Sequence, residues 1–300
     1  MSNLEQIYCD VDDFMKLFLP EYNKTLLKQQ KKRRIRASQL SESEVMTILI
    51  LFHQSNYRTF KHFYLREVFQ HLRAAFPNLV TYSRFVRLQQ SVLIPLCAYL
   101  QARRAQSTGI QFIDSTSLKV CHNKRINRNK VFEYTARRGK STMDWFFGFK
   151  LHLVINEGGE ILNVRLTRGN CDDRNVLPSI TKGLEGKLLA DKGYISNKYL
   201  ENLLKRGLYL ITNVRSNMKN RLLSLWDKIL LKKRFIIETV NDQLKNMQQI
   251  EHTRHRSMNN FMTNIIAGLL AYSHQAKKPS IHFTQKEKQL LNTASISMAT

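Results

Sequence analysis

The sequence predicts an α/β fold in which a mixed five-stranded sheet, flanked by helices, follows an N-terminal helical domain. Three observations support this prediction. The first hundred residues repeat apolar side chains at helical spacing. From Thr108 the pattern changes to short apolar runs and a strongly alternating segment, which are typical of strands. Strand and helix candidates then follow one another in an order that suits a mixed sheet covered by helices.

The N-terminal helices have clear starting signals. Ser41 and Glu44 form a capping-box pattern in front of an apolar run. The run follows the i, i+3, i+4, i+7 template at Val45, Ile48, Leu49 and Phe52. A second helix is expected over residues 65–72 and ends before Pro77, and a third begins after Thr81. We therefore expect a helical domain over residues 1–105.

A cluster of basic residues accompanies these helices. Its members are Lys28, Lys31, Lys32, Arg33, Arg34 and Arg36. Helices in series beside such a cluster suggest a helix-turn-helix-like module that binds DNA. A plain helical bundle with a charged, solvated face explains the same pattern equally well, so both interpretations stay open.

Beyond Thr108, apolar runs predict strands and helical spacing predicts the segments between them. The expected strands are residues 111–114, 147–155, 161–167, 187–191 and 208–214. The turn Glu157-Gly158-Gly159 joins the second and third strands as a hairpin. The expected helices run from Asp172 or Asp173 toward Gly183, and then over residues 197–206, 234–249 and 258–275.

The order of these elements is strand, hairpin, helix, strand, helix, strand and helix. This is the order of the ribonuclease H-like topology, a mixed sheet with helices on its faces. We therefore expect a ribonuclease H-like domain over residues 106–278. The polar residues 279–300 are expected to form a mobile tail.

The charge balance indicates a polyanionic partner. The chain has 48 Lys and Arg against 23 Asp and Glu, a formal net charge of +25 and a pI near 10.1. DNA, RNA or an anionic membrane would relieve this self-repulsion. The sequence shows neither an apolar run long enough to span a bilayer nor a signal-peptide pattern at residues 1–14. The four widely spaced cysteines suit free thiols, so we expect a cytoplasmic, bacterial-type, nucleoid-associated protein without a membrane partner.

Three carboxylates lie where this topology would bring them together. Asp114 ends the first strand and Asp191 ends the fourth, which are neighbours in the expected sheet. Glu238 lies in the helix after the fifth strand. Each residue alone has a structural interpretation, as a strand end, a turn cap or a solvent-facing helix position. Together they predict a metal site.

Carboxylates in such a group suit phosphodiester chemistry. Two divalent ions held ~3.5–4 Å apart can stabilise both the attacking and the leaving oxygen. Mg²⁺ prefers hard oxygen ligands and keeps several waters, so a few carboxylates suffice, and Mn²⁺ can substitute. We therefore expect Asp114, Asp191 and Glu238 to be both catalytic residues and ligands for two Mg²⁺ ions.

The surrounding segments resemble a known family. They are Phe112-Ile113-Asp114-Ser115-Thr116, Asn170-Cys171-Asp172-Asp173-Arg174, Ala190-Asp191-Lys192-Gly193-Tyr194 and Arg234-Phe235-Ile236-Ile237-Glu238. They are similar to the DDE transposases of bacterial insertion sequences. The spacing Arg234, Glu238, Lys245 is similar to the signature of the insertion-sequence-4-like superfamily, although Leu231 stands where that signature has tyrosine. The span from about 110 to 275, with Gly-Phe-Lys-Leu-His at 148–152, resembles the insertion-sequence-982 family most closely.

The resemblance implies a reaction and its partners. A transposase of this kind hydrolyses one strand at each transposon end and joins the freed 3′ hydroxyl to target DNA. The implied partner is double-stranded DNA, both the terminal inverted repeats and the target, and the implied active assembly is a homodimer. Two other functions remain open: a structure-specific DNA nuclease of the same fold, and a DNA-binding protein whose catalytic site has decayed.

Basic and aromatic side chains near these segments are expected to contact DNA. Arg234 and Lys245 share one helical stripe with Glu238, and the interval 119–150 holds nine Lys or Arg against two acids. The expected DNA-binding residues are Arg234, Lys245, Lys192, Tyr194, Arg137, Arg138, Lys140, Lys31, Lys32, Arg33 and Arg34. Lys150 has two possible positions, one approaching the site and one facing solvent.

Overall fold

The computed structural model describes residues 3–29, 38–141, 144–213, 223–251, 255–285 and 287. The expected DNA-binding residues Lys31, Lys32, Arg33 and Arg34 lie outside this part of the chain, as do residue 214 of the last expected strand and residues 286 and 288–300 of the expected tail. The chain divides into two compact units. One comprises Met1–Arg103 and Leu244–Gln275, and the other comprises Arg104–Gln243 and Ala276–Thr300.

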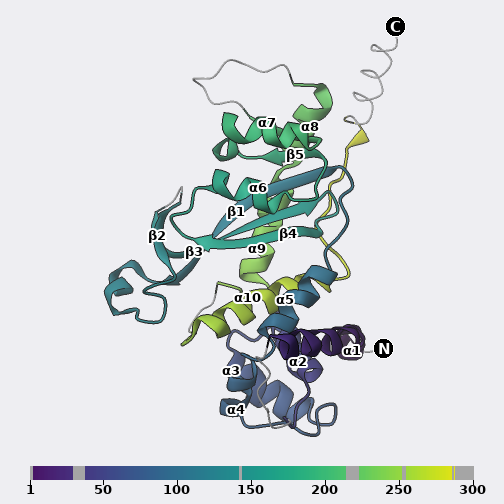
Figure 1. Ribbon diagram of the computed structural model, residues 1–300, viewed down its shortest axis with the longest axis vertical. Helices are drawn as coiled ribbons and strands as arrows, with labels where there is room; N and C mark the ends of the chain where they lie inside the picture. Colours follow the sequence, from purple (N-terminus) through teal and green to yellow (C-terminus); the bar gives the residue numbers. More distant parts are fainter. Residues whose placement is uncertain are drawn as a thin grey trace. The chain divides into compact units, whose positions relative to one another are not determined.

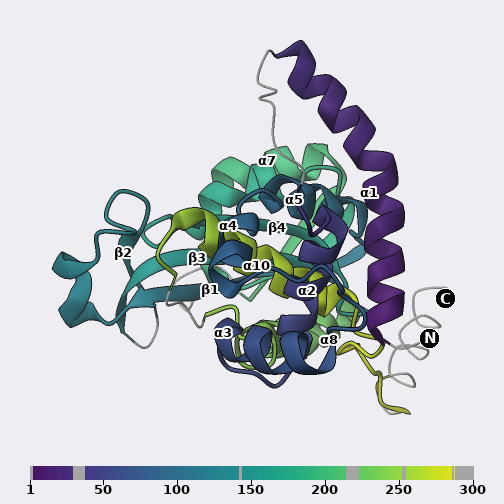
Figure 2. The same cartoon turned by 90° about the horizontal axis from the view of Figure 1, so that it is seen from below.

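The first unit is helical. Its elements are α1 (Asn3–Lys28), α2 (Glu42–Gln54), α3 (Phe60–His62), η1 (Phe63–His71), α4 (Tyr82–Leu88), α5 (Leu93–Ala102) and α10 (Met258–Ser273). The helix α10 packs against α2 and α5, and α1 packs against α2 (Figure 2). Residues from both ends of the sequence therefore build one core.

Local sequence signals set the starts of two of these helices. The expected capping box is confirmed, because Ser41 Oγ accepts from the backbone N–H of Glu44 while Glu44 accepts from the backbone N–H of Ser41. Thr81 caps α4 in the same manner by accepting from the N–H of Arg84. The helix expected over residues 65–72 is present as η1, which is wound as a π-helix. Among the described residues, none of the helices is both long and apolar enough to cross a bilayer.

The second unit contains the sheet (Figure 1). Its strands are β1 (Ile110–Cys121), β2 (Arg137–Lys140), β3 (Trp145–Asn156), β4 (Ile161–Arg168), β5 (Gly186–Ala190) and β6 (Leu208–Thr212). Its helices are η2 (Asn123–Arg128), η3 (Asp173–Val176), α6 (Leu177–Ile180), η4 (Lys192–Tyr194), α7 (Asn197–Lys205), α8 (Leu225–Lys233) and α9 (Phe235–Asn246), the last of which ends in the first unit.

The strand order is that of the ribonuclease H-like fold. The path β2-β3-β1-β5-β6 is completed by β4, which also pairs with β3. The strands β1, β3 and β4 are antiparallel, whereas β1, β5 and β6 are parallel. The five expected strands are present, and β2 adds a sixth. The sequence Arg-Arg-Gly-Lys of β2 lacks the apolar alternation that would have predicted a strand.

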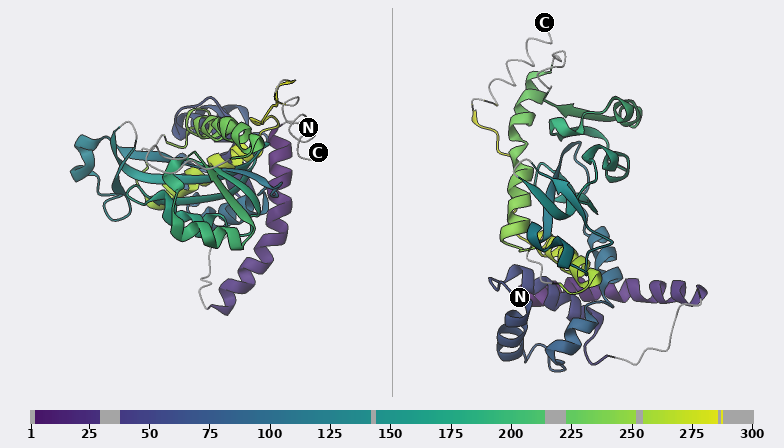
Figure 3. Two further views of the ribbon diagram at one scale, coloured as in Figure 1. Left: turned by 90° about the horizontal axis from the view of Figure 1, so that it is seen from above. Right: turned by 90° about the vertical axis from the view of Figure 1, so that its left-hand side faces the viewer.

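Helices cover both faces of this sheet. The core on one face joins Ile113 and Val154 of the sheet to Ile180 of α6 and Leu203 of α7. Side chains alternate along a strand, so Asp114 points to the opposite face. There α9 runs along the sheet (Figure 3, right), and Asn241 of α9 donates to Asp114. The sheet therefore presents its first expected carboxylate to α9.

The two compact units divide the chain differently from the expected ranges 1–105, 106–278 and 279–300. The difference concerns α10, whose buried stripe (Phe261, Ile265, Leu269 and Tyr272) belongs to the helical core of the first unit. An apolar helix at the end of a sequence gives no sign of which core it joins. The functional division into a DNA-binding domain and a catalytic domain stays a prediction.

Gly148 allows β1 and β3 to pair closely. A Cβ atom at this position would overlap the backbone carbonyl oxygen of Leu118, across the ladder. We expect Gly148→Ala to lower the free energy of unfolding by about 3 kcal/mol, because backbone cannot move aside as a side chain can. Thermal unfolding of Gly193→Ala provides the control, since a Cβ there meets no atom within 4 Å. Equal stability of the two variants would contradict the proposed clash.

Candidate functional site

Asp114 lies within β1 and not at its end as expected, because β1 continues to Cys121, and Asp191 directly follows β5, the adjacent parallel strand. The register pairs Ile110 with Lys187 and Phe112 with Leu189. Continued by two residues, the same offset sets Asp114 level with Asp191, which directly follows β5. Neighbouring strands lie ~4.8 Å apart, so the two backbones are close at this point. The expected adjacency of the first and fourth predicted strands is confirmed.

The third expected carboxylate lies in the first turn of α9. Glu238 is 57% exposed and its Oε1 accepts from Arg234 Nη2 at 2.7 Å. Arg234 directly precedes α9, and only 19% of its side chain is exposed. One turn further along, the Nδ2 of Asn241 donates to Asp114 Oδ2 at 3.1 Å. Two groups of this segment therefore act on Asp114. The amide of Asn241 donates a hydrogen bond to it, and the guanidinium of Arg234 acts on it through its charge.

The electrostatics of Asp114 reflect all of these groups. Burial is the main reason why the pKa of its carboxyl group is raised to about 6. A backbone hydrogen bond from Ser115 and the charge of Arg234 lower this pKa, whereas the charges of Glu238 and Asp191 raise it. Both other expected carboxylates thus act on Asp114 through their charge. The negative charges of Asp191 and Glu238 disfavour ionisation of Asp114, and a bound cation would offset this repulsion.

The donor atoms fit a hard divalent cation, although their present arrangement is not that of a formed metal site. Within the described ranges, no group of three His, Cys, Asp or Glu side chains is arranged to hold a metal ion. Glu238 instead contacts Arg234. The Glu238 side chain is 57% exposed, so this carboxylate is accessible to solvent on the first turn of α9.

Tyr194 corrects one expectation. It was expected to contact DNA, but it is 2% exposed and belongs to the core under α6 and α7. Its pKa is raised well above the usual range, chiefly by burial and then by the charges of Asp173 and Asp114. An aromatic residue next to a carboxylate gives no sign in the sequence of whether its ring points outward. In this structure Tyr194 supports the segment that follows Asp191.

Lys150 belongs to a partly buried polar cluster. Its Nζ donates to Asp173 Oδ1 at 2.9 Å and to the carbonyl oxygen of Cys171 at 3.0 Å. Beside it, His152 is fully buried and its Nε2 shares a hydrogen bond with Thr167 Oγ1 at 2.8 Å. Burial lowers the pKa of His152 to about 4, so the ring is neutral at pH 7. Lys150 therefore neither faces solvent nor approaches the three expected metal ligands. Its ammonium group pairs with Asp173 instead.

The remaining expected DNA contacts are distributed over both units. Lys192 is exposed immediately after Asp191. Lys245 pairs with Glu251 at 3.5 Å on the last turn of α9. Arg137 is half-buried and donates to the backbone carbonyls of Glu133 and Ala136, whereas Arg138 and Lys140 on the same strand are exposed. Arg138, Lys140 and Lys192 therefore present cationic groups to solvent.

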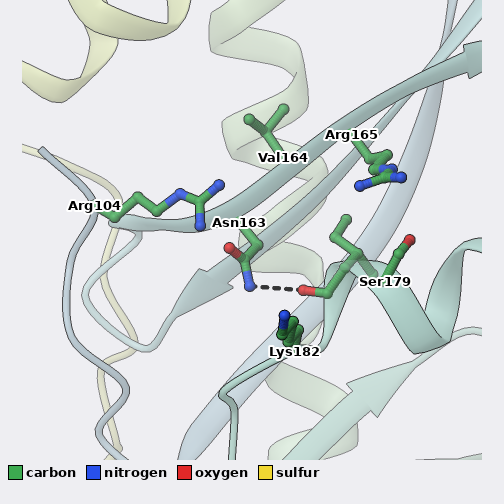
Figure 4. Close-up of a pocket in the computed structure, with 7 residues that line it drawn as sticks. Arg104, Asn163, Val164, Arg165, Ser179 and Lys182 are labelled. Atoms are coloured by element: carbon green, nitrogen blue, oxygen red, sulfur yellow. Dashed lines mark hydrogen bonds between the residues drawn. The ribbon is translucent and has the colours of Figure 1, made fainter. Parts of the chain in front are cut away.

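A basic pocket of about 170 Å³ lies elsewhere on the second unit (Figure 4). Its lining consists of Arg104, Asn163, Val164, Arg165, Ser179, Ile180 and Lys182. The Nδ2 of Asn163 donates to the carbonyl oxygen of Ile180 at 2.7 Å, which ties β4 to α6 at the base of this pocket. None of the three expected carboxylates lines it.

One contact of the site was not expected from the sequence. Asn241 contacts Asp114, and the only signal was its position on the helical stripe with Glu238. Of the two expected starts of the following helix, Asp172 or Asp173, the structure confirms Asp172 as the cap, and Asp173 pairs with Lys150. Two adjacent aspartates cannot be told apart without knowing where each side chain points.

Comparison with known proteins gives one family match. A family model described as a transposase DDE domain matches residues 104–258. No curated protein matches the chain.

Two solved structures are similar at low identity. The cryo-EM structure of the piggyBac transposase synaptic complex with hairpin DNA is 12% identical, with a TM-score of 0.46, and the match covers 96% of this chain and 76% of that chain. The crystal structure of the Mos1 strand transfer complex is 10% identical, with a TM-score of 0.24, and the match covers 75% of this chain and 82% of that chain. Neither TM-score supports an argument about this chain.

Proposed function

Because the chain belongs to the transposase DDE domain family, whose model matches more than half of its length, we propose that it cleaves DNA at transposon ends and joins the ends to target DNA. The observation that carries the proposal is the arrangement around Asp114: β1 pairs with β5, which Asp191 directly follows, and Asn241 of α9, the helix that bears Glu238, donates to the Asp114 carboxylate. An isolated structural aspartate would have no such surroundings.

We assign the catalytic roles to Asp114, Asp191 and Glu238, as ligands for two Mg²⁺ or Mn²⁺ ions. Bound divalent ions would polarise the scissile phosphate and supply a water nucleophile at neutral pH. Asn241 orients the Asp114 carboxylate through its amide hydrogen bond. Arg234, which pairs with Glu238 in this structure, would be available for a DNA phosphate if Glu238 bound a metal ion.

The DNA-binding part of the proposal includes both units. Lys192, Arg138 and Lys140 would hold phosphates near the sheet, and Lys245 would join them by leaving Glu251. The basic cluster with Lys31, Lys32, Arg33 and Arg34 would add a second contact through the helical domain. Double-stranded terminal repeats and target DNA are the proposed substrates, bound by a homodimer in a bacterial cytoplasm. Within the insertion-sequence-4-like superfamily, we propose that the chain belongs to the insertion-sequence-982 family.

A cleavage and joining assay tests this function. The probe is duplex DNA carrying the segments that flank the gene, incubated with the purified chain and plasmid target in Mg²⁺, Mn²⁺ or EDTA. We expect nicks and joined products with either metal and no reaction in EDTA. Nicks without joined products would instead identify a nuclease. DNA binding with no metal-dependent product would identify a DNA-binding protein without activity.

A further inference from the structure

We propose that residues 122–141, 144 and 145, here called the basic arm, bind unpaired bases of DNA by stacking them on Trp145 and Tyr134. This inference rests on the proposed function, because it names a DNA feature that the transposase would hold. The arm is inserted between β1 and β3 and contains η2 and β2. It extends to one side of the sheet in two perpendicular views (Figures 1 and 2).

The arm is anchored to the sheet at several points. Phe132 is 2% exposed and its ring meets that of Phe149 edge-on, at 6.1 Å between centroids. Gly139 lies so close to the backbone of Gly169 that a Cβ atom would not fit. Asn123 donates to the carbonyl oxygen of Trp145 at 2.8 Å. The exposed side chains of the arm therefore stand on a fixed backbone.

Two large aromatic side chains of the arm face solvent. Tyr134 is 78% exposed and Trp145 is 53% exposed, although Phe132 of the same arm is buried. Leaving such rings in water forgoes the free energy that burial would provide. A flat aromatic face is, however, a stacking surface for a nucleic acid base.

The charges around these rings are mainly positive, which indicates a negatively charged partner. Seven Lys or Arg lie in the arm against two acids: Lys124, Arg125, Arg128, Lys130, Arg137, Arg138 and Lys140 against Glu133 and Asp144. The Nζ of Lys140 lies 5.9 Å from the centre of the Trp145 ring, and β2 pairs these two residues directly. Arg138 lies two residues before Lys140 and hence on the same face. Cations beside an exposed ring suit a phosphate backbone whose bases reach the ring.

Unpaired rather than paired bases are the proposed ligand. In a duplex the base faces are stacked on each other, so an aromatic side chain can reach only the edges. A single-stranded extension or an unpaired nucleotide exposes a face, and each stacked base contributes ~1–3 kcal/mol. Strand cleavage at a DNA end supplies such nucleotides locally.

Tryptophan fluorescence tests the proposal in full-length protein and EDTA, where no cleavage occurs. The chain has two tryptophans, and Trp226 stacks on Phe283 at 5.2 Å. In the Trp226→Phe protein the emission therefore reports on Trp145. We expect a duplex with a five-nucleotide single-stranded extension to quench this emission and to bind about tenfold more tightly than the blunt duplex.

Substitutions then separate stacking from charge. Trp145→Ala and Tyr134→Ala should each reduce the preference for the extension at least about threefold while leaving affinity for the blunt duplex unchanged, and Trp145→Phe should retain part of it. Arg138→Gln should weaken both DNAs alike. The matched control is Tyr209→Ala, which removes a 55% exposed ring from β6.

Equal quenching by the blunt duplex, or an unchanged preference in Trp145→Ala, would overturn the proposal and would leave the aromatic rings to another partner, such as a protein. Because the assay needs no metal, its failure is distinct from a failure of cleavage. If the protein binds single-stranded extensions through Trp145 but does not cleave DNA, the proposal for the basic arm stands and the proposed transposase function is wrong.

Discussion

Replacement of Asp114 by asparagine is expected to reduce metal-dependent DNA cleavage by more than about a thousandfold, equivalent to about 4 kcal/mol of activation free energy. Asparagine keeps the shape of the side chain and a carbonyl oxygen for the Asn241 amide, but it removes the charge that would hold a divalent ion. DNA binding in EDTA should stay within about twofold of wild type, because no phosphate contact is assigned to Asp114. Cleavage that persists would remove Asp114 from the site.

The same substitution is expected to stabilise the metal-free protein at neutral pH. The folded pKa of Asp114 is about 6 against 3.8 for an unperturbed aspartate, so the folded state holds this proton more tightly than the unfolded state. Ionising Asp114 therefore costs stability as pH rises from about 4 to about 6, by about 3 kcal/mol in total. Asparagine avoids this cost.

Thermal unfolding in EDTA across this pH range checks the sign. At pH 7.5 Asp114→Asn should unfold at a higher temperature than wild type, and the difference should vanish near pH 4, where wild-type Asp114 is protonated. Glu201→Gln, an exposed position on α7, is the control and should show no comparable gain. A stability difference that grows on acidification would contradict the raised pKa.

Substitution of Lys150 by methionine should destabilise the second unit by about 3 kcal/mol. Lys150 and Asp173 have side chains that are 17% and 25% exposed, and they lie 2.9 Å apart. Removing the cation leaves a largely buried carboxylate whose remaining neighbour, His152 Nδ1 at 3.9 Å, is neutral at pH 7, and this is the costly half of a buried ion pair. Lys182→Met, at an exposed position, should change stability by less than about 0.5 kcal/mol.

A double variant distinguishes the ion pair from the packing of the lysine stem. Lys150→Met with Asp173→Leu removes both charges, and we expect it to recover at least about 1 kcal/mol of the loss. If calorimetry shows that the losses of unfolding free energy in the two single variants add up to the loss in the double variant, the ion pair itself contributes nothing to stability. The single variant should also cleave DNA more slowly, because the charge of Asp173 acts on Tyr194, which supports the segment after Asp191.

Much of the sheet could be predicted from the sequence because burial imposes a pattern. The alternating apolar residues of β3 and the apolar run of β5 both identify strands of a covered sheet, although the intervening residues of β3 are buried as well and are not exposed to water. The strand β2 could not be predicted, since its pairing with β3 depends on a neighbour and on glycine at position 139. The helix α8 was likewise not expected.

The candidate site was predictable in position but only partly in contacts. The closeness of β1, which carries Asp114, to β5, which Asp191 follows, could be predicted from the order of the elements, whereas the continuation of β1 beyond Asp114 to Cys121 could not. The pairing of Glu238 with Arg234, the burial of Tyr194 and the amide of Asn241 on Asp114 depend on where side chains point. The spacing of residues along a helix predicts that their side chains share a face, but it does not predict which atoms those side chains contact.

The composition of the first unit has a consequence for synthesis on the ribosome. The apolar surfaces of α2 and α5 are completed by α10, which ends at Ser273. During translation α2 and α5 emerge early and lack their packing partner until α10 has been synthesised more than 150 residues later. A premature stop codon after the carboxylate-bearing helix would consequently disable the N-terminal helices as well, so truncated copies of the gene would yield chaperone clients instead of working fragments.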